Sequence, residues 1–137
     1  MIKTDIANLD EAVNEVLEIY CTEVTEAVDS ISEKAAKQLR NSISRDSPVR
    51  TGKQKDSWKV SKPTRKTMRR YRGKAFVVHS EDDYRKVHLL ENGHLTRDGV
   101  TRTKPIRYVS KNEEKIIEQY QRDVATAIKA VKYWYRA

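Results

Sequence analysis

The first third of this chain carries apolar side chains every three or four residues, with Glu and Lys between them. This spacing is typical of an amphipathic helix. The series comprises Leu9, Val13, Val16, Tyr20, Val24, Ala27, Ile31, Ala35, Leu39 and Ile43. A helix from Asn8 to about Ser44 would be about 50 Å long at 1.5 Å per residue, which is longer than a compact domain of this size is wide. We therefore expect the helix either to kink or to pack in part against another subunit.

Both ends of this predicted helix have recognisable signals. Asn8 and Glu11 have the spacing of a capping box, and acidic residues suit the positive end of the helix dipole. Farther on, Pro48 lacks a backbone donor and disfavours a helical conformation at the preceding residue, while Gly52 permits the positive φ of a tight turn. We expect the helix to begin near Asn8 and to stop before Pro48.

A second helix is predicted near the C-terminus, from a capping-box pair at Ser110 and Glu113 to about Tyr135. Its apolar face comprises Ile116, Ile117, Tyr120, Val124, Ala127, Ile128 and Val131. The first helix is the simplest partner for this face. The aromatic residues 133–135 either anchor that packing or form an exposed contact.

Four segments between the helices have the composition of strands: 57–61, 64–69, 75–79 and 106–109. The most apolar of them begins Ala-Phe-Val-Val and should be the central strand, with Trp58 and Val60 facing the core from a neighbouring strand. The predicted fold class is α+β, with a long N-terminal helix, a small antiparallel sheet of three to four strands, and a C-terminal helix packed on the first.

Length and composition predict a single folded domain, because 137 residues can bury one core but not two. It divides into a long acidic helix (1–46), a basic β-sheet region with loops and a short helix (47–110), and the C-terminal helix (111–137). Cys21 is the sole cysteine, which favours a reducing compartment. No apolar run approaches the roughly 20 residues of a membrane span, so we expect no membrane partner.

Charge is divided unevenly along the chain. Residues 1–46 contain 5 Lys or Arg and 10 Asp or Glu, a net charge of −5. Residues 47–110 contain 17 Lys or Arg and 6 Asp or Glu, a net charge of +11. Residues 111–137 contain 6 Lys or Arg and 4 Asp or Glu, which brings the net charge of the whole chain to +8. Such a separation drives ordered self-association or contact with a polyanion. The alternative is that the two halves neutralise each other within one molecule.

Basic side chains are densest in the central region, at a density that can neutralise phosphates without regard to sequence. The candidates for a protein interface or for contact with DNA are Arg50, Lys53, Lys55, Lys59, Arg65, Lys66, Arg69, Arg70 and Arg72. Trp58 lies among them, and its alternatives are stacking on bases or burial in the core. We favour burial.

No motif predicts catalysis or a bound cofactor. His88 and His94 are six residues apart and Gly93 lies between them, so they lack the i, i+4 spacing of a zinc-binding helix. Glu91 and His94 are expected to bond loop backbone instead. Cys21 has no activating base near it in sequence, and no phosphate-binding or dinucleotide motif is present. We therefore expect a protein that is not an enzyme and that holds no metal or cofactor.

Two motifs carry a resemblance to a known family. Residues 47–53, Ser-Pro-Val-Arg-Thr-Gly-Lys, are followed by Asp56-Ser57, and then by residues 88–99, His-Leu-Leu-Glu-Asn-Gly-His-Leu-Thr-Arg-Asp-Gly. In order and spacing they resemble the tailed-phage neck and tail-component family named after the tenth gene product of a lambda-like coliphage. The turn positions in these motifs are Pro48, Thr51, Gly52, Glu91, Gly93, His94 and Gly99. Arg50 stands where an acidic residue is common in the family, and Gln54 where an apolar one is common.

The resemblance implies a structural virion protein at the head-to-tail junction. Such a protein would assemble in the host bacterial cytoplasm as a homo-oligomeric ring, between the head-closure or adaptor protein and the tail terminator or tail tube. Packaged DNA would pass through the channel, so some basic residues would face it. The competing hypothesis is a free basic nucleic-acid-binding protein of the phage or its host.

Overall fold

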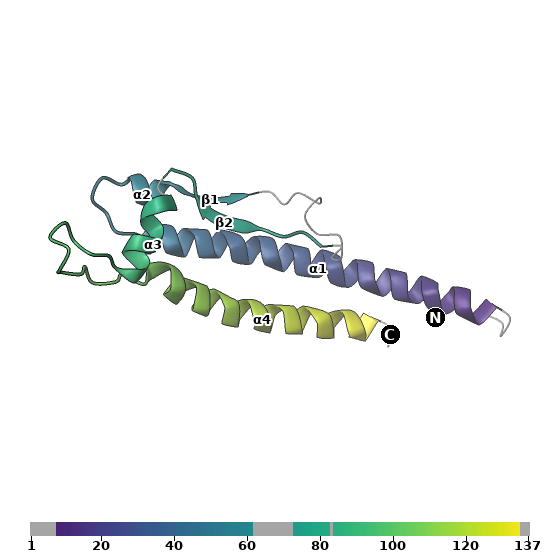
Figure 1. Cartoon of the computed structure of the whole chain (residues 1–137). Helices are drawn as coiled ribbons and strands as arrows, with labels where there is room; N and C mark the ends of the chain where they lie inside the picture. The colour runs from purple at the N-terminus through teal and green to yellow at the C-terminus, as the bar shows by residue number, and fades with distance from the viewer. Residues whose placement is uncertain (1–7, 62–72, 83, 135–137) are drawn as a thin grey trace.

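Two long antiparallel helices set the length of the molecule (Figure 1). The computed structural model describes residues 8–61, 73–82 and 84–134. Helix α1 (Leu9–Asp46) and helix α4 (Tyr108–Trp134) pack along one another, and a small sheet lies against α1 near its C-terminal end. The predicted packing of the C-terminal helix on the first is confirmed.

Polar contacts join the two long helices at two levels. The buried amide of Asn112 donates from Nδ2 to Asp46 Oδ2 (2.9 Å) and to Tyr108 O (2.7 Å). Farther along, Ser32 Oγ and Tyr120 Oη lie 3.0 Å apart in a hydrogen bond. These bonds fix the C-terminal half of α1 against the N-terminal half of α4.

Helix α1 has 38 residues and is therefore about 57 Å long. It begins directly after Asn8, as predicted, but Asn8 makes no side-chain cap hydrogen bond, so the expected capping interaction is absent there. At the other end Ser47 is extended, with φ −63° and ψ 139°, which is the conformation that Pro48 imposes on the residue before it. Ser47 Oγ donates to Ile43 O (2.7 Å) and so closes the last turn.

The sheet has two antiparallel strands within the described residues, β1 (Trp58–Ser61) and β2 (Val77–Ser80). Trp58 pairs with Ser80, and Ser61 with Val77. Of the other two predicted strands, segment 64–69 lies outside the described residues. Segment 106–109 is not a strand, and that prediction is wrong, because its first half is a loop and its second half is the first turn of α4.

Contacts with helix α3 (Tyr84–Asn92) explain why segment 106–109 turns into a helix. Ile106 N donates to Leu90 O (2.8 Å), and Tyr108 N donates to Ile106 O (2.8 Å). The carboxylate of Glu91 then accepts hydrogen bonds from the first turn of α4. The helix therefore begins at Tyr108, three residues before Lys111, the first helical residue that a cap at Ser110 indicates.

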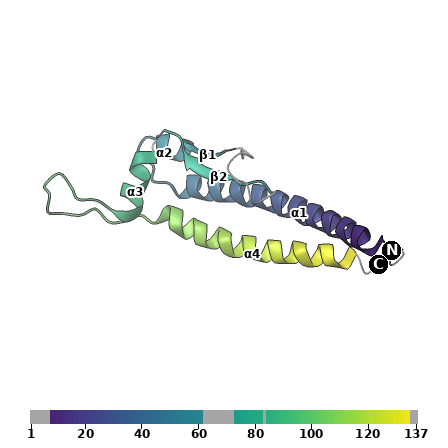
Figure 2. The same cartoon turned by 45° about the vertical axis from the view of Figure 1, so that its right-hand side comes forward.

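Two short helices close this end of the molecule, α3 and the single-turn helix α2 (Lys53–Asp56) (Figures 1 and 2). The short helix predicted in the central region corresponds to α3. After α3 the chain continues into Gly93, which has φ 73°. Helix α2 was not predicted, and it follows Gly52, whose φ of 81° lets the chain re-enter a helical turn after Pro48.

The core lies where α1, β1 and the start of α4 meet. Ile43, Trp58 and Tyr108 are 2%, 5% and 4% exposed, and the rings of Trp58 and Tyr108 meet edge to face with centroids 6.4 Å apart. Around them pack the half-buried side chains of Leu39, Val78, Val87, Leu90 and Val109. The predicted burial of Trp58 is confirmed.

The two ends of the molecule are different. At one end the N-terminal turns of α1 extend beyond the end of α4, and at the other a loop between α3 and α4 projects from the body (Figures 1 and 2). Leu9 and Val13 lie on the extending turns and are exposed, although the sequence pattern places them in the apolar stripe. The stripe of α1 is thus covered by α4 and the sheet over only part of its length.

Candidate functional site

The first sequence motif forms a tight turn between α1 and β1. Trp58 Nε1 donates to Ser47 Oγ (3.1 Å), and Asp56 N donates to Gly52 O (3.1 Å). Ser57 Oγ donates to Gln54 O (2.9 Å) and lies 2.7 Å from Ser80 Oγ on β2. The motif therefore ties the end of α1 to both strands.

Gln54 lies within this motif, on α2. Its side chain is buried, and its Nε2 lies 3.5 Å from Tyr108 Oη, a long hydrogen bond. Its Oε1 has no hydrogen-bond partner among the residues that the structure describes. An apolar side chain at this position would leave no such acceptor buried.

Four of the nine basic candidates lie within the described residues. Arg50, Lys53 and Lys55 are exposed on the turn and on α2, where Thr51 is also exposed, and Lys59 on β1 pairs with Glu81. The other five, Arg65, Lys66, Arg69, Arg70 and Arg72, lie outside the described residues. The structure therefore brings Arg50, Lys53 and Lys55 together at one end of the molecule.

The second sequence motif places Glu91 at the N-terminus of α4. Its carboxylate accepts hydrogen bonds from the backbone N–H groups of Val109 (3.1 Å) and Ser110 (2.9 Å), and also from the hydroxyl of Ser110. These N–H groups have no intrahelical acceptor, and the negative charge lies at the positive end of the helix dipole. Glu91 thus acts as the cap of α4 from a neighbouring helix.

Replacement of Glu91 by Ala is expected to lower the free energy of unfolding by about 1–2 kcal/mol, because the N–H groups of Val109 and Ser110 lose their acceptor. Glu91→Gln keeps one acceptor oxygen and should cost less. Urea unfolding followed by circular dichroism measures both values. The matched control is Glu118→Ala on an exposed turn of the same helix, which should change stability by less than about 0.5 kcal/mol. An equal loss in Glu91→Ala and Glu118→Ala would contradict the capping role.

Gly93 and His94 join α3 to the projecting loop. His94 N donates to Thr103 Oγ1 (3.0 Å), Thr103 N donates to His94 O (2.9 Å), and His94 Nδ1 lies 3.2 Å from Thr103 Oγ1. The ring of His94 therefore bonds a side-chain hydroxyl rather than loop backbone. A Cβ on Gly93 would lie only 2.5 Å from Thr103 O, so the backbones pass each other too closely for any other residue.

The projecting loop is held in shape by Asp98. Its Oδ1 accepts from Thr96 Oγ1 (2.5 Å) and from the N–H groups of Val100 and Thr101 (3.0 Å each), and its Oδ2 accepts from Thr101 Oγ1 (2.6 Å). Hydrogen bonds from the hydroxyls of Thr101 and Thr96, and then from the two backbone N–H groups, hold the pKa of Asp98 well below its usual range. Gly99, with φ 71°, completes the turn.

Apolar side chains are exposed on this ordered loop. Val100 is 85% exposed and Leu95 is also exposed. Leu95 and Arg102 form an isolated antiparallel bridge at the base of the loop, and Arg97 lies between them and the turn. We call residues Leu95–Arg102 the loop tip.

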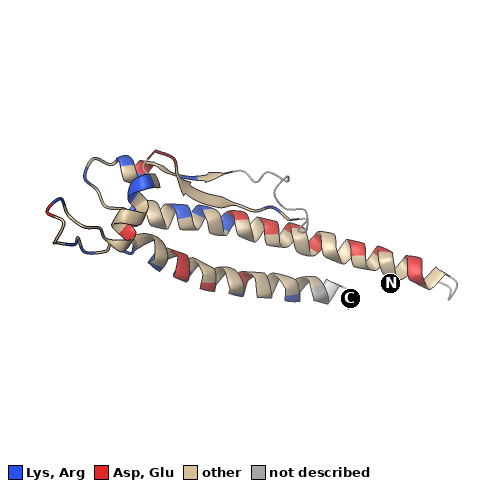
Figure 3. Cartoon of the chain, in the orientation of Figure 1, with Lys and Arg blue, Asp and Glu red and all other residues tan. Residues whose placement is uncertain are grey.

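Toward the opposite end of the molecule, the N-terminal part of α1 is acidic. From residue 9 to residue 31 helix α1 has no Lys or Arg, and it carries Asp10, Glu11, Glu15, Glu18, Glu23, Glu26 and Asp29 (Figure 3). Leu9, Val13 and Leu17 lie among these charges, one turn apart, and are between 47% and 53% exposed. We call Leu9, Val13 and Leu17 the N-terminal face of α1.

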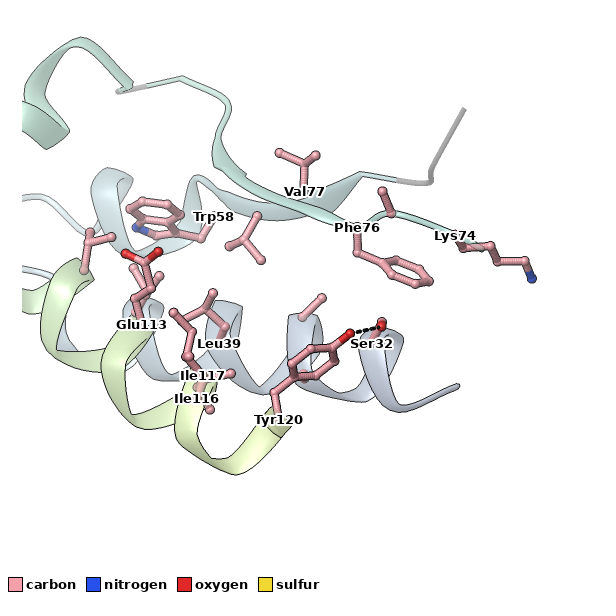
Figure 4. A pocket seen from close by; sticks show the side chains of 16 residues that line it. Ser32, Leu39, Trp58, Lys74, Phe76, Val77, Glu113, Ile116, Ile117 and Tyr120 are labelled. Atoms are coloured by element: carbon pink, nitrogen blue, oxygen red, sulfur yellow. Dashed lines mark hydrogen bonds between the residues drawn. The ribbon is translucent and has the colours of Figure 1, made fainter. Parts of the chain in front are cut away.

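A groove of about 620 Å³ opens beside the core, between β2, α1 and α4 (Figure 4). Leu39 of α1 lies on its floor, Phe76 forms one side, and Ile116 and Tyr120 of α4 form the other, whereas the side chain of Val77 points away from the groove. The lining is mostly apolar, although Ser32, Lys74 and Glu113 also reach it. Exposed apolar surfaces of this kind are typical of contacts with another chain and of ligand-binding grooves.

The described residues offer little for catalysis or metal binding. No group of three or more His, Cys, Asp or Glu among them is placed to hold a metal ion. His88 is exposed on α3, and Cys21 is exposed on α1. No helix in the described part of the chain is both long enough and apolar enough to cross a membrane.

The roles of three residues in this arrangement were missed by the sequence analysis: Asp98, Val100 and Asn112. The Asp98-Gly99 pair is a recognised turn signal and could have identified the residue that orders the loop. The exposure of Val100 and the burial of Asn112 carry no signal in the sequence, because each depends on contacts between distant segments.

Two chemically different ends, an open apolar groove and a projecting ordered loop are features typical of a protein that contacts other chains. Residues 8–93 match the family described as "Bacteriophage HK97-gp10, putative tail-component". The match covers more than half of the chain, which belongs to this family. No curated protein and no solved structure matches the chain significantly. The protein is thus a structural component of the phage tail or neck, and it belongs to the virion with other phage proteins.

Proposed function

We propose that this protein is a non-catalytic subunit of the phage neck that assembles into a homo-oligomeric ring. In this proposal the ring lies between the head-closure or adaptor protein and the tail terminator or tail tube. The observation that supports it best is the separation of charge along the molecule. The acidic N-terminal part of α1 and the basic end with Arg50, Lys53 and Lys55 lie at opposite ends of a helix about 57 Å long.

Opposite charge at opposite ends favours a contact between unlike surfaces of neighbouring copies. Such a heterologous contact closes into a ring when a whole number of these rotations between copies makes one full turn. Charge complementarity also sets the direction in which copies meet and opposes contacts between like ends. A two-fold dimer of antiparallel copies would also pair opposite ends, so the number of copies in the assembly distinguishes a dimer from a ring.

Packaged DNA is the second proposed partner, since it would pass through the channel of the ring. The exposed side chains of Lys53 and Lys55 could face it. The burial of Trp58 argues against the alternative of a free nucleic-acid-binding protein, because it removes an aromatic platform on which bases could stack.

The assembly of the purified protein tests the proposal. Negative-stain images and native mass spectrometry should show closed rings, either alone or after mixing with the products of neighbouring neck genes. Glu11→Lys/Glu15→Lys should raise the concentration needed for half-assembly by about tenfold or more, because it reverses charge at the acidic end. Added salt should weaken assembly of the unchanged protein.

The matched control is Glu114→Lys/Glu118→Lys, which changes the net charge equally but on exposed turns of α4. This variant should assemble like the unchanged protein. A protein that stays monomeric with all neck partners, and that binds DNA tightly with a steep loss of affinity on adding salt, would instead be the free nucleic-acid-binding protein.

A further inference from the structure

We infer that the loop tip docks on the N-terminal face of α1 in a second copy of this chain, with Val100 as its anchor. The inference rests on the proposed function and names the surfaces through which neighbouring copies would meet.

The first step is that the loop tip is ordered without a partner. Asp98 accepts four hydrogen bonds, from Thr96, Val100 and twice from Thr101. Thr96 N donates to Thr101 O (2.8 Å), and Gly99 N donates to Thr96 O (3.0 Å). A loop that already has its bound shape loses little conformational entropy on binding.

The second step is that the ordered loop tip presents an apolar side chain to solvent. Val100 is 85% exposed and nothing in the described residues covers it. An ordered turn needs no valine at this position, and a fixed apolar side chain at the end of a projection is typical of a contact residue. The neighbouring charges are mostly positive, since Arg97, Arg102 and Lys104 are exposed and Asp98 is the one acidic residue among them.

The third step identifies the partner by its chemistry. The N-terminal face of α1 offers Leu9, Val13 and Leu17, spaced four residues apart on one side of the helix. The exposed carboxylates of Glu11, Glu15 and Glu18 lie beside them. An apolar centre with a negative rim complements an apolar centre with a positive rim, which is the usual anatomy of a specific interface.

The fourth step excludes a contact within one molecule. The loop tip leaves the body beyond the C-terminal end of α1, whereas the N-terminal face lies at the other end of that helix, which is about 57 Å long (Figure 2). The loop tip can therefore reach this face only in another molecule. The contact joins unlike surfaces, so each copy offers one loop tip and one face.

Disulfide cross-linking between two different variants tests the contact directly. Val13→Cys and Val100→Cys are prepared as separate proteins, each with Cys21→Ser so that it carries a single thiol. Oxidation of the mixture should give a covalent dimer in at least about tenfold excess over either variant alone, because only the mixture brings the two thiols together. A mixture of Val100→Cys with Ala130→Cys/Cys21→Ser, whose thiol is exposed on α4, is the control and should give little dimer.

Assembly of Val100→Asp gives a second measurement that does not depend on thiols. This variant should fold normally, since the side chain is exposed, but should need a concentration about tenfold higher for half-assembly. Rings that form as well in Val100→Asp as in the unchanged protein, or a Val13–Val100 mixture that links no better than its control, would overturn this inference and leave the proposed function standing. If Val100→Asp forms intact rings but no longer binds another neck protein, that result would also overturn this inference. Failure of the unchanged protein to assemble at all would instead refute the proposed function.

Discussion

Replacing Trp58 with Ala should lower the free energy of unfolding by about 3–5 kcal/mol. The side chain is 5% exposed, packs on Ile43 and Tyr108, and donates a hydrogen bond to Ser47. The core holds few fully buried side chains, and the substitution would leave a cavity at its centre, where α1, β1 and α4 meet. Because typical domains are stable by about 5–15 kcal/mol, this loss could unfold a large fraction of the molecules at 37 °C. Urea unfolding followed by circular dichroism measures it.

Trp58→Phe separates packing from hydrogen bonding in this experiment. The smaller ring keeps part of the contact with Ile43 and Tyr108 but offers no donor to Ser47, so the expected loss is about 1–2 kcal/mol. A loss below about 1 kcal/mol in Trp58→Ala would show that the core is not centred on this side chain.

The second large effect is expected from Gly93→Ala. The φ of 73° strains any residue with a Cβ by about 1–2 kcal/mol, and the added atom would lie 2.5 Å from Thr103 O. Because that oxygen belongs to the backbone, the chain segment after the loop must move, and the total loss should exceed about 2 kcal/mol. Thermal and urea unfolding measure the change.

Gly99→Ala is the matched control, because Gly99 has nearly the same φ of 71° but a Cβ there would meet nothing within 4 Å. Its cost should be limited to the backbone strain of about 1–2 kcal/mol. Equal losses for the two substitutions would show that the close approach of Gly93 to Thr103 does not contribute.

The helices of this fold were predictable because their signals are local and repeated. The period of α1 extends over many turns, and Pro48 marks its end within two residues. The capping signals were less informative. Asn8 makes no side-chain cap bond, and α4 begins at Tyr108 because Glu91, a residue of another helix, supplies the acceptor.

The error at residues 106–109 has the same physical origin. Three apolar residues in a four-residue segment fit a strand or the first turn of a helix equally well, and a tertiary contact with Leu90 decides between them. Burial was also overestimated from the pattern. Leu9 and Val13 continue the stripe of α1, but α4 ends before it reaches them.

The candidate surfaces were predictable in their charge but not in their shape. The reversal of charge near residue 46 is visible in the sequence, and the structure converts it into two ends of one long molecule. The order of the loop tip depends on four hydrogen bonds to Asp98. Only the Asp-Gly pair hints at this order.

The unequal lengths of the two long helices affect how copies can find one another. Helix α1 has 38 residues and α4 has 27, so the first turns of α1 stand alone. These turns lack the tertiary packing that stabilises most helices in proteins, and holding them in one position has an entropic cost. In the proposed ring, each early contact between copies should therefore be weak and quickly reversed, so that misplaced copies dissociate before the ring closes.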